Sequence, residues 1–420
     1  MNSPRRDFLR FAGLASAAFA LPQAIRAATT PPRVLVIGGG FGGATVAKYL
    51  KLWGGNVDVT LIDRNSEHYA CILSNLVVTG SLPMDRIKLN YTSLQTKRGV
   101  NFVQGEALSV DPDAREVTVR TSSGRYAYSY DKLVLAPGVE FITPDGAYNA
   151  DLTPHAWKAG PQTLLLKSQL AAIAAKQTFV MTIPKSPYRC PPGPYERACT
   201  IADYLKRKKK GAKIIVLDAN ASIQAEPINF GNAFAKTYKG VLTYIPNAPV
   251  TSVDSTAKSI ITPKGTFKGA VINVIPNQRA GQIVTSAGLV NDPSNRWALV
   301  DPLTYASTVH PDIHILGDSQ GTGQPKSGHM ANSQAKVCAD AIIRSFTGEA
   351  PDPLPVTSSA CFSPITSTTA SWLTASFQYD PVSKTMKRVE ASFAEAPKPT
   401  SDGMQQMFQW ANNIFADSFS

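Results

Sequence analysis

A glycine-rich turn near the N-terminus constrains the fold of this chain more than any other feature. Residues 33–47 read as a short apolar strand, a tight turn and the start of a helix. Gly38, Gly40 and Gly43 occupy the G-x-G-x-x-G positions, which allow a tight turn, close approach of the backbone to a pyrophosphate, and close packing of helix on strand. The pyrophosphate of a dinucleotide rests on the N-terminus of such a helix, where unpaired N–H groups favour negative charge.

An acid at the end of the next strand completes this fingerprint. The apolar strand 57–62 is followed by Asp63, at the spacing from the glycines where a carboxylate binds a ribose hydroxyl. A glycine motif alone is a weak signal, but here the strand, the helix and the acid occur together. The sequence therefore predicts a dinucleotide site.

Two later segments indicate that the dinucleotide is FAD. Residues 130–138 form a strand that ends in Ala-Pro-Gly138, a pattern typical of flavoproteins that bind two dinucleotides. Residues 308–318 form another strand and deliver Asp318, where such proteins hold the ribityl chain of FAD. A helix follows, with Lys326 just before it as a further candidate flavin ligand, and the helix N-terminus can stabilise an anionic reduced flavin.

The order of strands and helices predicts an α/β protein with two Rossmann-like dinucleotide-binding domains, arranged as in glutathione reductase, and a C-terminal α+β domain. In the second domain a strand ends in Asp218, as in a nucleotide site, but no glycine fingerprint precedes it, so NAD(P)H is not expected to bind. Near the C-terminus we expect a hairpin and a helix at 404–415, whose apolar face packs on the core or a partner, with a lipid surface as the alternative. The predicted bounds are 31–150 with 295–350 for the FAD-binding domain, 151–294 for the second domain and 351–420 for a C-terminal interface domain.

The first 28 residues have the pattern of a twin-arginine export signal. Arg5 and Arg6 precede a Phe-Leu pair, an apolar run covers 11–21, and small residues end the segment. Such a run is too short to cross ~30 Å of hydrocarbon, so cleavage and export to the periplasm are expected. The full chain has a formal net charge of +12. Cleavage removes four arginines and one aspartate, so the remaining protein is still basic. Export argues against a nucleic-acid partner, and the basic run 206–210 is interpreted as the solvated end of a helix.

Five cysteines in an exported chain cannot all pair with one another. Cys199 and Cys338 lie among Ala, Ile and Val on helices and are predicted to be packed core thiols. Cys71 follows the second strand of the FAD-binding domain, in a segment expected to pass near the flavin. It is interpreted either as a small buried apolar residue or as a thioether link to a flavin methyl group.

Cys190 lies in a proline-rich loop ahead of a helix that begins near Pro194. A thiolate close to a helix N-terminus is stabilised, and Arg189 adds positive charge, so Cys190 is expected to be reactive. Glu196, in the first turn of that helix, is either an acid favoured by the helix dipole or a proton shuttle for Cys190. Cys361 is far away in the sequence. It is interpreted either as the partner of Cys190 in a structural disulfide or as a cysteine that takes part in thiol exchange.

Three segments together resemble the flavoprotein subunit of flavocytochrome c sulfide dehydrogenase, a family related to sulfide:quinone reductases and, more distantly, to disulfide reductases. The segments are 68–75, 188–196 and 360–363. The resemblance covers essentially the whole mature chain. It implies that Cys71 carries FAD covalently, that Cys190 and Cys361 form a redox-active disulfide beside the flavin, and that Glu196 is an acid–base group.

The same resemblance implies a periplasmic sulfide dehydrogenase that passes electrons to a c-type cytochrome subunit. No C-x-x-C-H motif occurs in the chain, so haem c is expected only in the partner, and no metal site is predicted. In this mechanism hydrosulfide attacks the disulfide, electrons pass to FAD and then singly to haem, and sulfur leaves as elemental sulfur or polysulfide. The alternatives are a membrane-associated sulfide:quinone oxidoreductase, a noncatalytic sulfur-carrier or electron-transfer subunit, and an NADH-linked disulfide reductase.

Overall fold

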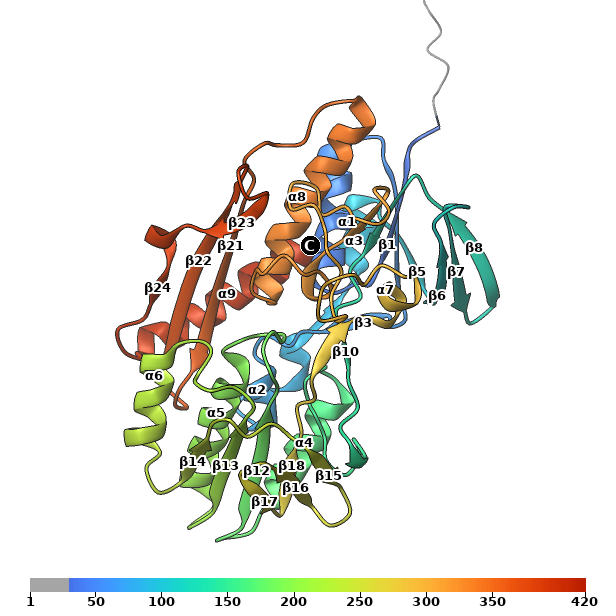
Figure 1. Ribbon diagram of the computed structural model, residues 1–420. Helices are drawn as coiled ribbons and strands as arrows, with labels where there is room; N and C mark the ends of the chain where they lie inside the picture. The colour runs from blue at the N-terminus through green and yellow to red at the C-terminus, as the bar shows by residue number, and fades with distance from the viewer. Residues whose placement is uncertain (1–29) are drawn as a thin grey trace, which may run out of the picture. The chain divides into compact units, whose positions relative to one another are not determined.

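The computed structural model describes residues 30–420, and the predicted export signal at 1–28 lies outside them (Figure 1). Its first sheet has five parallel strands, and residues 313–315 join a sheet otherwise built from residues 33–135. The central strand is almost entirely buried, which explains its continuous apolar run. In spatial order the strands are β20 (Ile313–Ile315), β9 (Lys132–Leu135), β1 (Arg33–Ile37), β2 (Asp58–Asp63) and β5 (Asn101–Gln104).

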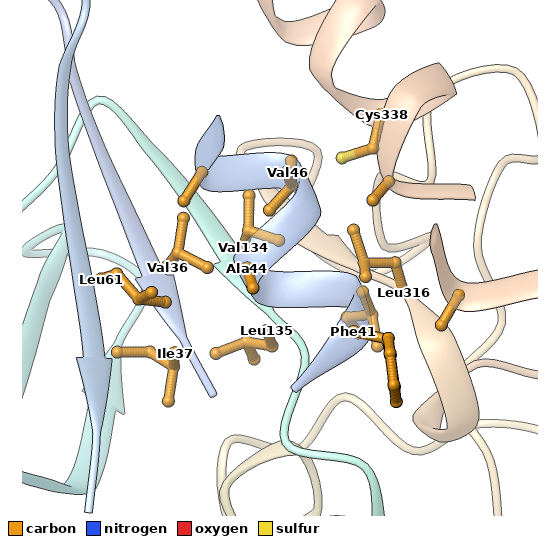
Figure 2. Packing of buried hydrophobic residues seen from close by; sticks show 14 of the residues in the cluster. Val36, Ile37, Phe41, Ala44, Val46, Leu61, Val134, Leu135, Leu316 and Cys338 are labelled. Atoms are coloured by element: carbon orange, nitrogen blue, oxygen red, sulfur yellow. The ribbon is translucent and has the colours of Figure 1, made fainter. Parts of the chain in front are cut away.

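The first helix starts at the glycine turn and packs on the last helix of the FAD-binding segment. These are α1 (Phe41–Gly54) and α8 (Gly328–Thr347). Figure 2 shows the hydrophobic core around α1, with Val36, Ala44, Val46, Val134, Leu135, Leu316 and Cys338 among the packed side chains. Cys338 is fully buried here and Cys199 is fully buried in α5 (Gly193–Lys208), so the prediction that both are packed core thiols is confirmed.

The second sheet has four parallel strands, with α5 packed against its second strand. The chain leaves β12 through the loop that carries Cys190 and then enters α5, which repeats the strand–loop–helix order of the first sheet. Two parallel sheets of this kind confirm the predicted α/β class. The elements are β14 (Leu242–Ile245), β13 (Lys213–Asp218), β12 (Thr178–Ile183) and β18 (Val271–Asn273), with α4 (Pro161–Ala172) against β18.

Smaller sheets and helices connect the two parallel sheets. The antiparallel pair β10 (Val139–Phe141) and β19 (Gln278–Ala280) lies between them in Figure 1. The remaining strands of this part are β3 (Glu67–Tyr69) with β4 (Lys88–Asn90), β6 (Glu106–Asp111) with β7 (Glu116–Thr121) and β8 (Gly124–Ser129), and β11 (Gly146–Ala147) with β15 (Ser252–Asp254), β16 (Ser259–Thr262) and β17 (Gly265–Lys268). The short helices are α2 (Ser74–Val78), α3 (Thr92–Arg98), α6 (Pro227–Asn232) and α7 (Gln282–Ser286).

The C-terminal part is an antiparallel sheet with a helix, which confirms the predicted α+β portion. The predicted hairpin is β22 (Ala370–Asp380) with β23 (Thr385–Arg388), and β24 (Ala394–Glu395) also pairs with β22. The sequence analysis did not anticipate β21 (Val356–Pro364), which pairs with β22 along its whole length. The final helix is α9 (Ser401–Phe419).

Helix α9 buries its apolar face against α1 and β22, as the core-packing interpretation predicts. Its buried residues include Met407, Ala411, Ile414 and Phe415, and the Phe415 ring stacks on Phe41 of α1 at a centroid distance of 6.0 Å. Within residues 30–420, no helix combines the length and the apolar character needed to cross a bilayer.

Candidate functional site

A cavity of about 780 Å³ is lined by residues from the first parallel sheet, from the loop and helix that follow β12, and from the C-terminal sheet. Nine of the eleven candidate site residues line it, namely Gly38, Gly40, Asp63, Cys71, Gly138, Cys190, Glu196, Asp318 and Cys361. The other two, Gly43 and Lys326, do not. The cavity thus brings the dinucleotide fingerprint and three cysteines of distant segments together.

The glycine turn at the cavity has a geometry that other residues do not tolerate. Gly38 has a φ of 99°, and a Cβ on it would lie 2.4 Å from the carbonyl oxygen of Ala136. A Cβ on Gly43 would lie 1.7 Å from the carbonyl oxygen of Gly38, so this glycine lets α1 approach the turn. Gly40 precedes α1 without a side-chain cap, and the first N–H groups of the helix are available for an anion such as pyrophosphate.

Two acids on the cavity wall can bind hydroxyl groups of a dinucleotide. The backbone N–H of Gly39 donates to Asp63 Oδ2 at 2.7 Å, which ties this acid to the glycine turn. Asp318 Oδ1 is buried without a hydrogen-bond partner among residues 30–420, and burial raises the pKa of this carboxyl. A buried acceptor that lacks a partner beside a cavity fits a hydroxyl of the ribityl chain. The residues present therefore fit FAD.

Lys326 lies behind the cavity wall. Its Nζ donates to the carbonyl oxygens of Asp318 at 3.0 Å and Gln320 at 2.6 Å, and it lies 3.7 Å from the centre of the Trp297 ring. Burial lowers the pKa of this lysine to about 7. The Lys326 carbonyl oxygen accepts a hydrogen bond from the backbone N–H of Cys190 at 2.6 Å. The observed contacts of Lys326 therefore support the cysteine loop.

Cys71 lies on the cavity wall, in the turn after β3. Its Sγ is 3.5 Å from the carbonyl oxygen of Trp157, and the residue is half-buried. It is thus open to a ligand in the cavity, unlike the two core thiols Cys199 and Cys338.

Cys190 and Cys361 reach the same cavity from different elements. Cys190 lies in the loop before α5 with a φ of 59°, a left-handed conformation that is strained for a residue with a Cβ. Gly193 makes room for its thiol, because a Cβ on this glycine would lie 2.8 Å from Cys190 Sγ. Cys361 lies on β21. Both are free thiols in the structure.

Cys190 is a weaker acid than its position near a helix N-terminus predicts, and Cys361 is also a weak acid. Burial, followed by the charges of Cys361 and Glu196, raises the pKa of Cys190 well above its usual value, and the opposing effect of Arg189 is smaller. Burial also raises the pKa of Cys361 to about 12. The expectation of a stabilised Cys190 thiolate is wrong for this environment, because desolvation shifts a pKa by up to ~3–5 units whereas a helix terminus contributes only ~0.3–1 kcal/mol. A high thiol pKa disfavours the thiolate both as an attacking group and as a leaving group, so burial alone favours neither role for the two cysteines.

Glu196 is a buried acid beside Cys190. Its Oε1 accepts a hydrogen bond from Asn75 Nδ2 at 2.9 Å, and Asn75 Oδ1 in turn accepts from Arg197 Nε at 2.8 Å. Burial raises the pKa of Glu196 to about 8. Near neutral pH this carboxyl can therefore both hold and release a proton.

Three functional residues of this region were not singled out from the sequence. Asn75 and Arg197 orient Glu196, and the buried Arg197 guanidinium also lies 4.7 Å from the centre of the Trp157 ring. Glu226 is a second buried carboxyl, whose Oε1 accepts from Ser363 Oγ at 2.6 Å, and burial raises its pKa to about 7. Glu226 also perturbs Cys361, the cysteine two residues before Ser363. The only local signals were that Asn75 ends the segment 68–75 and that Arg197 directly follows the segment 188–196.

Two stretches of the chain match models of known protein families, and the fold is similar to solved structures. Residues 163–276 match the family model of the central part of the sulfide dehydrogenase (flavocytochrome c) flavoprotein chain, and residues 32–167 match that of pyridine nucleotide-disulphide oxidoreductases. The fold is similar to that of sulfide:quinone oxidoreductase from Aquifex aeolicus, with a TM-score of 0.74, 20% identity and 92% of each chain covered. It is also similar to an NAD-dependent persulfide reductase from A. fulgidus, with a TM-score of 0.62, 13% identity, and 92% of this chain and 77% of that one covered.

Two curated relatives match over a short stretch of the chain. The type II NADH:quinone oxidoreductase NdhA of Mycobacterium tuberculosis is 34% identical over 109 residues, and that of Staphylococcus aureus is 35% identical over 108 residues. These matches span about a quarter of this chain and of each relative. Together, the two family models and the fold confirm the resemblance inferred from the sequence.

Proposed function

The chain is a flavoprotein oxidoreductase with the central domain of the flavocytochrome c sulfide dehydrogenases, and we propose that it oxidises sulfide through a Cys190–Cys361 disulfide and FAD. The observation that carries this proposal is that both cysteines line the cavity that also contains the dinucleotide fingerprint. In this proposal no pyridine nucleotide takes part in the reaction, since no glycine fingerprint precedes Asp218, the acid that ends a strand of the second sheet.

The residues that hold FAD are those of the first sheet. The glycine turn and the N-terminus of α1 bind the pyrophosphate, Asp63 binds a ribose hydroxyl, and Asp318 binds the ribityl chain, with Gly138 on the same wall. When bound, FAD supplies a two-electron acceptor that releases electrons one at a time. The proposed acceptor of those electrons is a c-type cytochrome subunit, as the sulfide dehydrogenase domain implies.

The sulfur chemistry belongs to the cysteine pair. Hydrosulfide attacks one sulfur of the disulfide, so that a new S–S bond forms, the Cys190–Cys361 bond breaks, and one cysteine becomes a persulfide while the other leaves as a thiolate. Over a full cycle each hydrosulfide loses one proton and two electrons and leaves as sulfur or polysulfide, and the disulfide reforms. Glu196, buried beside Cys190, accepts the proton.

Addition of sulfide to the purified flavoprotein tests this proposal. We expect bleaching of the flavin by sulfide under anaerobic conditions, no bleaching by NADH, and electron transfer to a c-type cytochrome in preference to a soluble quinone. Preference for the quinone would favour the sulfide:quinone reductase reading, whose structural support is the similarity to the Aquifex enzyme. A flavin that stays oxidised in sulfide would indicate a noncatalytic carrier, and bleaching by NADH would indicate a disulfide reductase.

Cys71 is the proposed covalent attachment point of FAD, and acid precipitation tests it. Its thiol lies on the cavity wall, and a thioether would retain the cofactor after export. We expect the yellow colour to stay in the acid-precipitated pellet of the wild-type protein and to move to the supernatant for Cys71→Ala. Colour in the wild-type supernatant would contradict the link without affecting the disulfide mechanism. The periplasmic location proposed here rests on the twin-arginine pattern of the first 28 residues.

We expect Glu196→Gln to stabilise the protein at alkaline pH. Burial raises the folded-state pKa of this carboxyl from 4.5 to about 8, so between these pH values the folded state binds more protons than the unfolded state. Wild-type stability therefore falls as pH rises from about 4.5 to about 8, and glutamine removes this dependence. The melting temperature of the variant should exceed that of the wild type at pH 8 and match it near pH 4.5.

The same variant should bleach more slowly with sulfide, by about 10²-fold, because glutamine accepts no proton. Parallel pH–stability curves for the two proteins would contradict a buried proton on Glu196. Wild-type bleaching rates in the variant would exclude it as the proton acceptor.

A further inference from the structure

Asp218 occupies the position of a ribose-binding acid, yet it is closed to any ligand. It ends β13 and its side chain is fully buried. Its Oδ2 accepts hydrogen bonds from the hydroxyl groups of Tyr195 and Tyr244, both at 2.7 Å. Its Oδ1 accepts from the backbone N–H and the side-chain Nδ2 of Asn220, both at 2.8 Å. Four neutral donors thus compensate the buried carboxylate, and none of its acceptor positions is directed to a nucleotide.

The residues that donate to Asp218 also hold the chain at both ends of the cysteine loop, which is residues 184–192 between β12 and α5. On the N-terminal side, Asn220 Oδ1 accepts from the backbone N–H of Ser186 at 3.0 Å, and Asn220 Nδ2 donates to the carbonyl oxygen of Pro184 at 2.9 Å. On the C-terminal side, Tyr195 lies in the first turn of α5. One buried carboxylate therefore connects the chain before Cys190 to the helix after it.

The loop needs such support because Cys190 is strained. A residue other than glycine in a left-handed conformation is strained and persists only where its surroundings hold it. The loop's other contacts include Tyr188 Oη to the Pro191 carbonyl oxygen at 3.1 Å, the Arg189 N–H to Gln278 Oε1 at 2.9 Å, and the Cys190 N–H to the Lys326 carbonyl oxygen at 2.6 Å. The hydrogen bonds that Asp218 accepts from Asn220 and Tyr195 connect the two ends of the loop.

We propose that Asp218 and Tyr195 are positioning residues, which fix Cys190 Sγ for exchange with Cys361. The acid that would face a ribose in a nucleotide-binding domain organises the cysteine loop in this chain. The inference rests on the proposed sulfide oxidation through the two cysteines. A reacting group that is misplaced by about 1 Å can lose roughly 10²-fold in rate, so a loosened loop has a measurable effect.

Tyr195→Phe and Tyr244→Phe form a matched pair of tests. Each removes one hydroxyl that donates to Asp218 Oδ2 at 2.7 Å, but Tyr244 lies on β14, whereas Tyr195 lies on α5 and also accepts from the Gln224 N–H at 3.2 Å. In stopped-flow mixing with sulfide, we expect flavin bleaching to slow by roughly tenfold or more in Tyr195→Phe and by less than about threefold in Tyr244→Phe. Melting temperatures of both variants report any difference in stability.

A second measurement does not use turnover. The ratio of Cys190–Cys361 disulfide to dithiol is measured in dithiothreitol buffers of set potential, by thiol labelling and peptide mapping. We expect Tyr195→Phe to shift this equilibrium toward the dithiol more than Tyr244→Phe does, because a loosened loop holds the two sulfurs together less effectively. Asn220→Ala tests the other side of the loop, with the same expected shift.

The outcomes separate this inference from the proposed function. Equal bleaching rates and equal disulfide equilibria in the two tyrosine variants would overturn the positioning role. A wild-type flavin that sulfide does not bleach would overturn the proposed function, while the disulfide equilibria would still decide whether Asp218 and Tyr195 position Cys190. If Tyr195→Phe does not fold, Asn220→Ala decides by the same two measurements.

Discussion

We expect Cys190→Ser and Cys361→Ser each to lose sulfide-dependent cytochrome c reduction by on the order of 10³-fold or more. Each substitution replaces one sulfur of the pair on the cavity wall by a hydroxyl, which can neither form nor reopen an S–S bond. The measurement is the initial rate of cytochrome reduction after sulfide addition, with the flavoprotein and the proposed cytochrome subunit purified together.

Cys338→Ala provides the control for this loss. Its thiol is fully buried in the core between α1 and α8 and does not line the cavity, so the variant should lose some stability but keep the rate (Figure 2). Reduction of the flavin by dithionite in all variants shows that the cofactor is intact. Full sulfide activity in either serine variant would exclude the disulfide mechanism.

The second large effect is expected at the glycine turn. Gly43→Ala should lower the free energy of unfolding by about 3 kcal/mol or more and prevent FAD incorporation, because the new Cβ would lie 1.7 Å from the backbone carbonyl oxygen of Gly38. Backbone atoms cannot move aside as a flexible side chain can, so α1 must separate from the turn that binds pyrophosphate. Denaturant unfolding and the ratio of flavin to protein absorbance measure the two effects.

A helical glycine elsewhere in the chain is the matched control. Gly231 in α6 has no atom within 4 Å of an added Cβ, so Gly231→Ala should gain up to ~1 kcal/mol from helix propensity and retain FAD. Both substitutions replace glycine by alanine, but their effects on the free energy of unfolding are expected to have opposite signs. Similar effects on stability would contradict the close approach of α1 to the glycine turn.

The first and second parallel sheets were predictable because their signals are local. Apolar runs mark the strands, and the glycine turn marks the first strand–helix junction. Strand β21 was missed because residues 356–364 are mostly small and polar, without the alternation that marks a half-buried strand. It exists as a strand because it pairs with β22 along nine positions of the register, from Val356 to Pro364. The strand conformation of residues 356–364 therefore depends on pairing with β22, and their own sequence does not reveal it.

The candidate site was predictable in its motifs but not in its supporting contacts. Arg197 bonds to Asn75 across 122 positions of the chain, and Glu226 bonds to Ser363 across 137. Such contacts have no local spacing pattern. The acidity of Cys190 was predicted wrongly for a related reason, since a helix terminus is visible in the sequence whereas the burial that outweighs it arises from the assembled fold.

Segments that lie after residue 300 in the sequence complete the first sheet and cover its first helix, so the protein can assemble only after they are synthesised. The edge strand of this sheet is β20, its first helix is covered by α8 and α9, and the third cysteine of the cavity, Cys361, lies on β21. A nascent chain that has emerged only to residue 300 lacks all four elements, so the cavity closes after synthesis is nearly complete. Contacts this distant in sequence slow folding compared with local ones. Cys361, the last of the five cysteines to leave the ribosome, thus sets the earliest moment at which its pair can form.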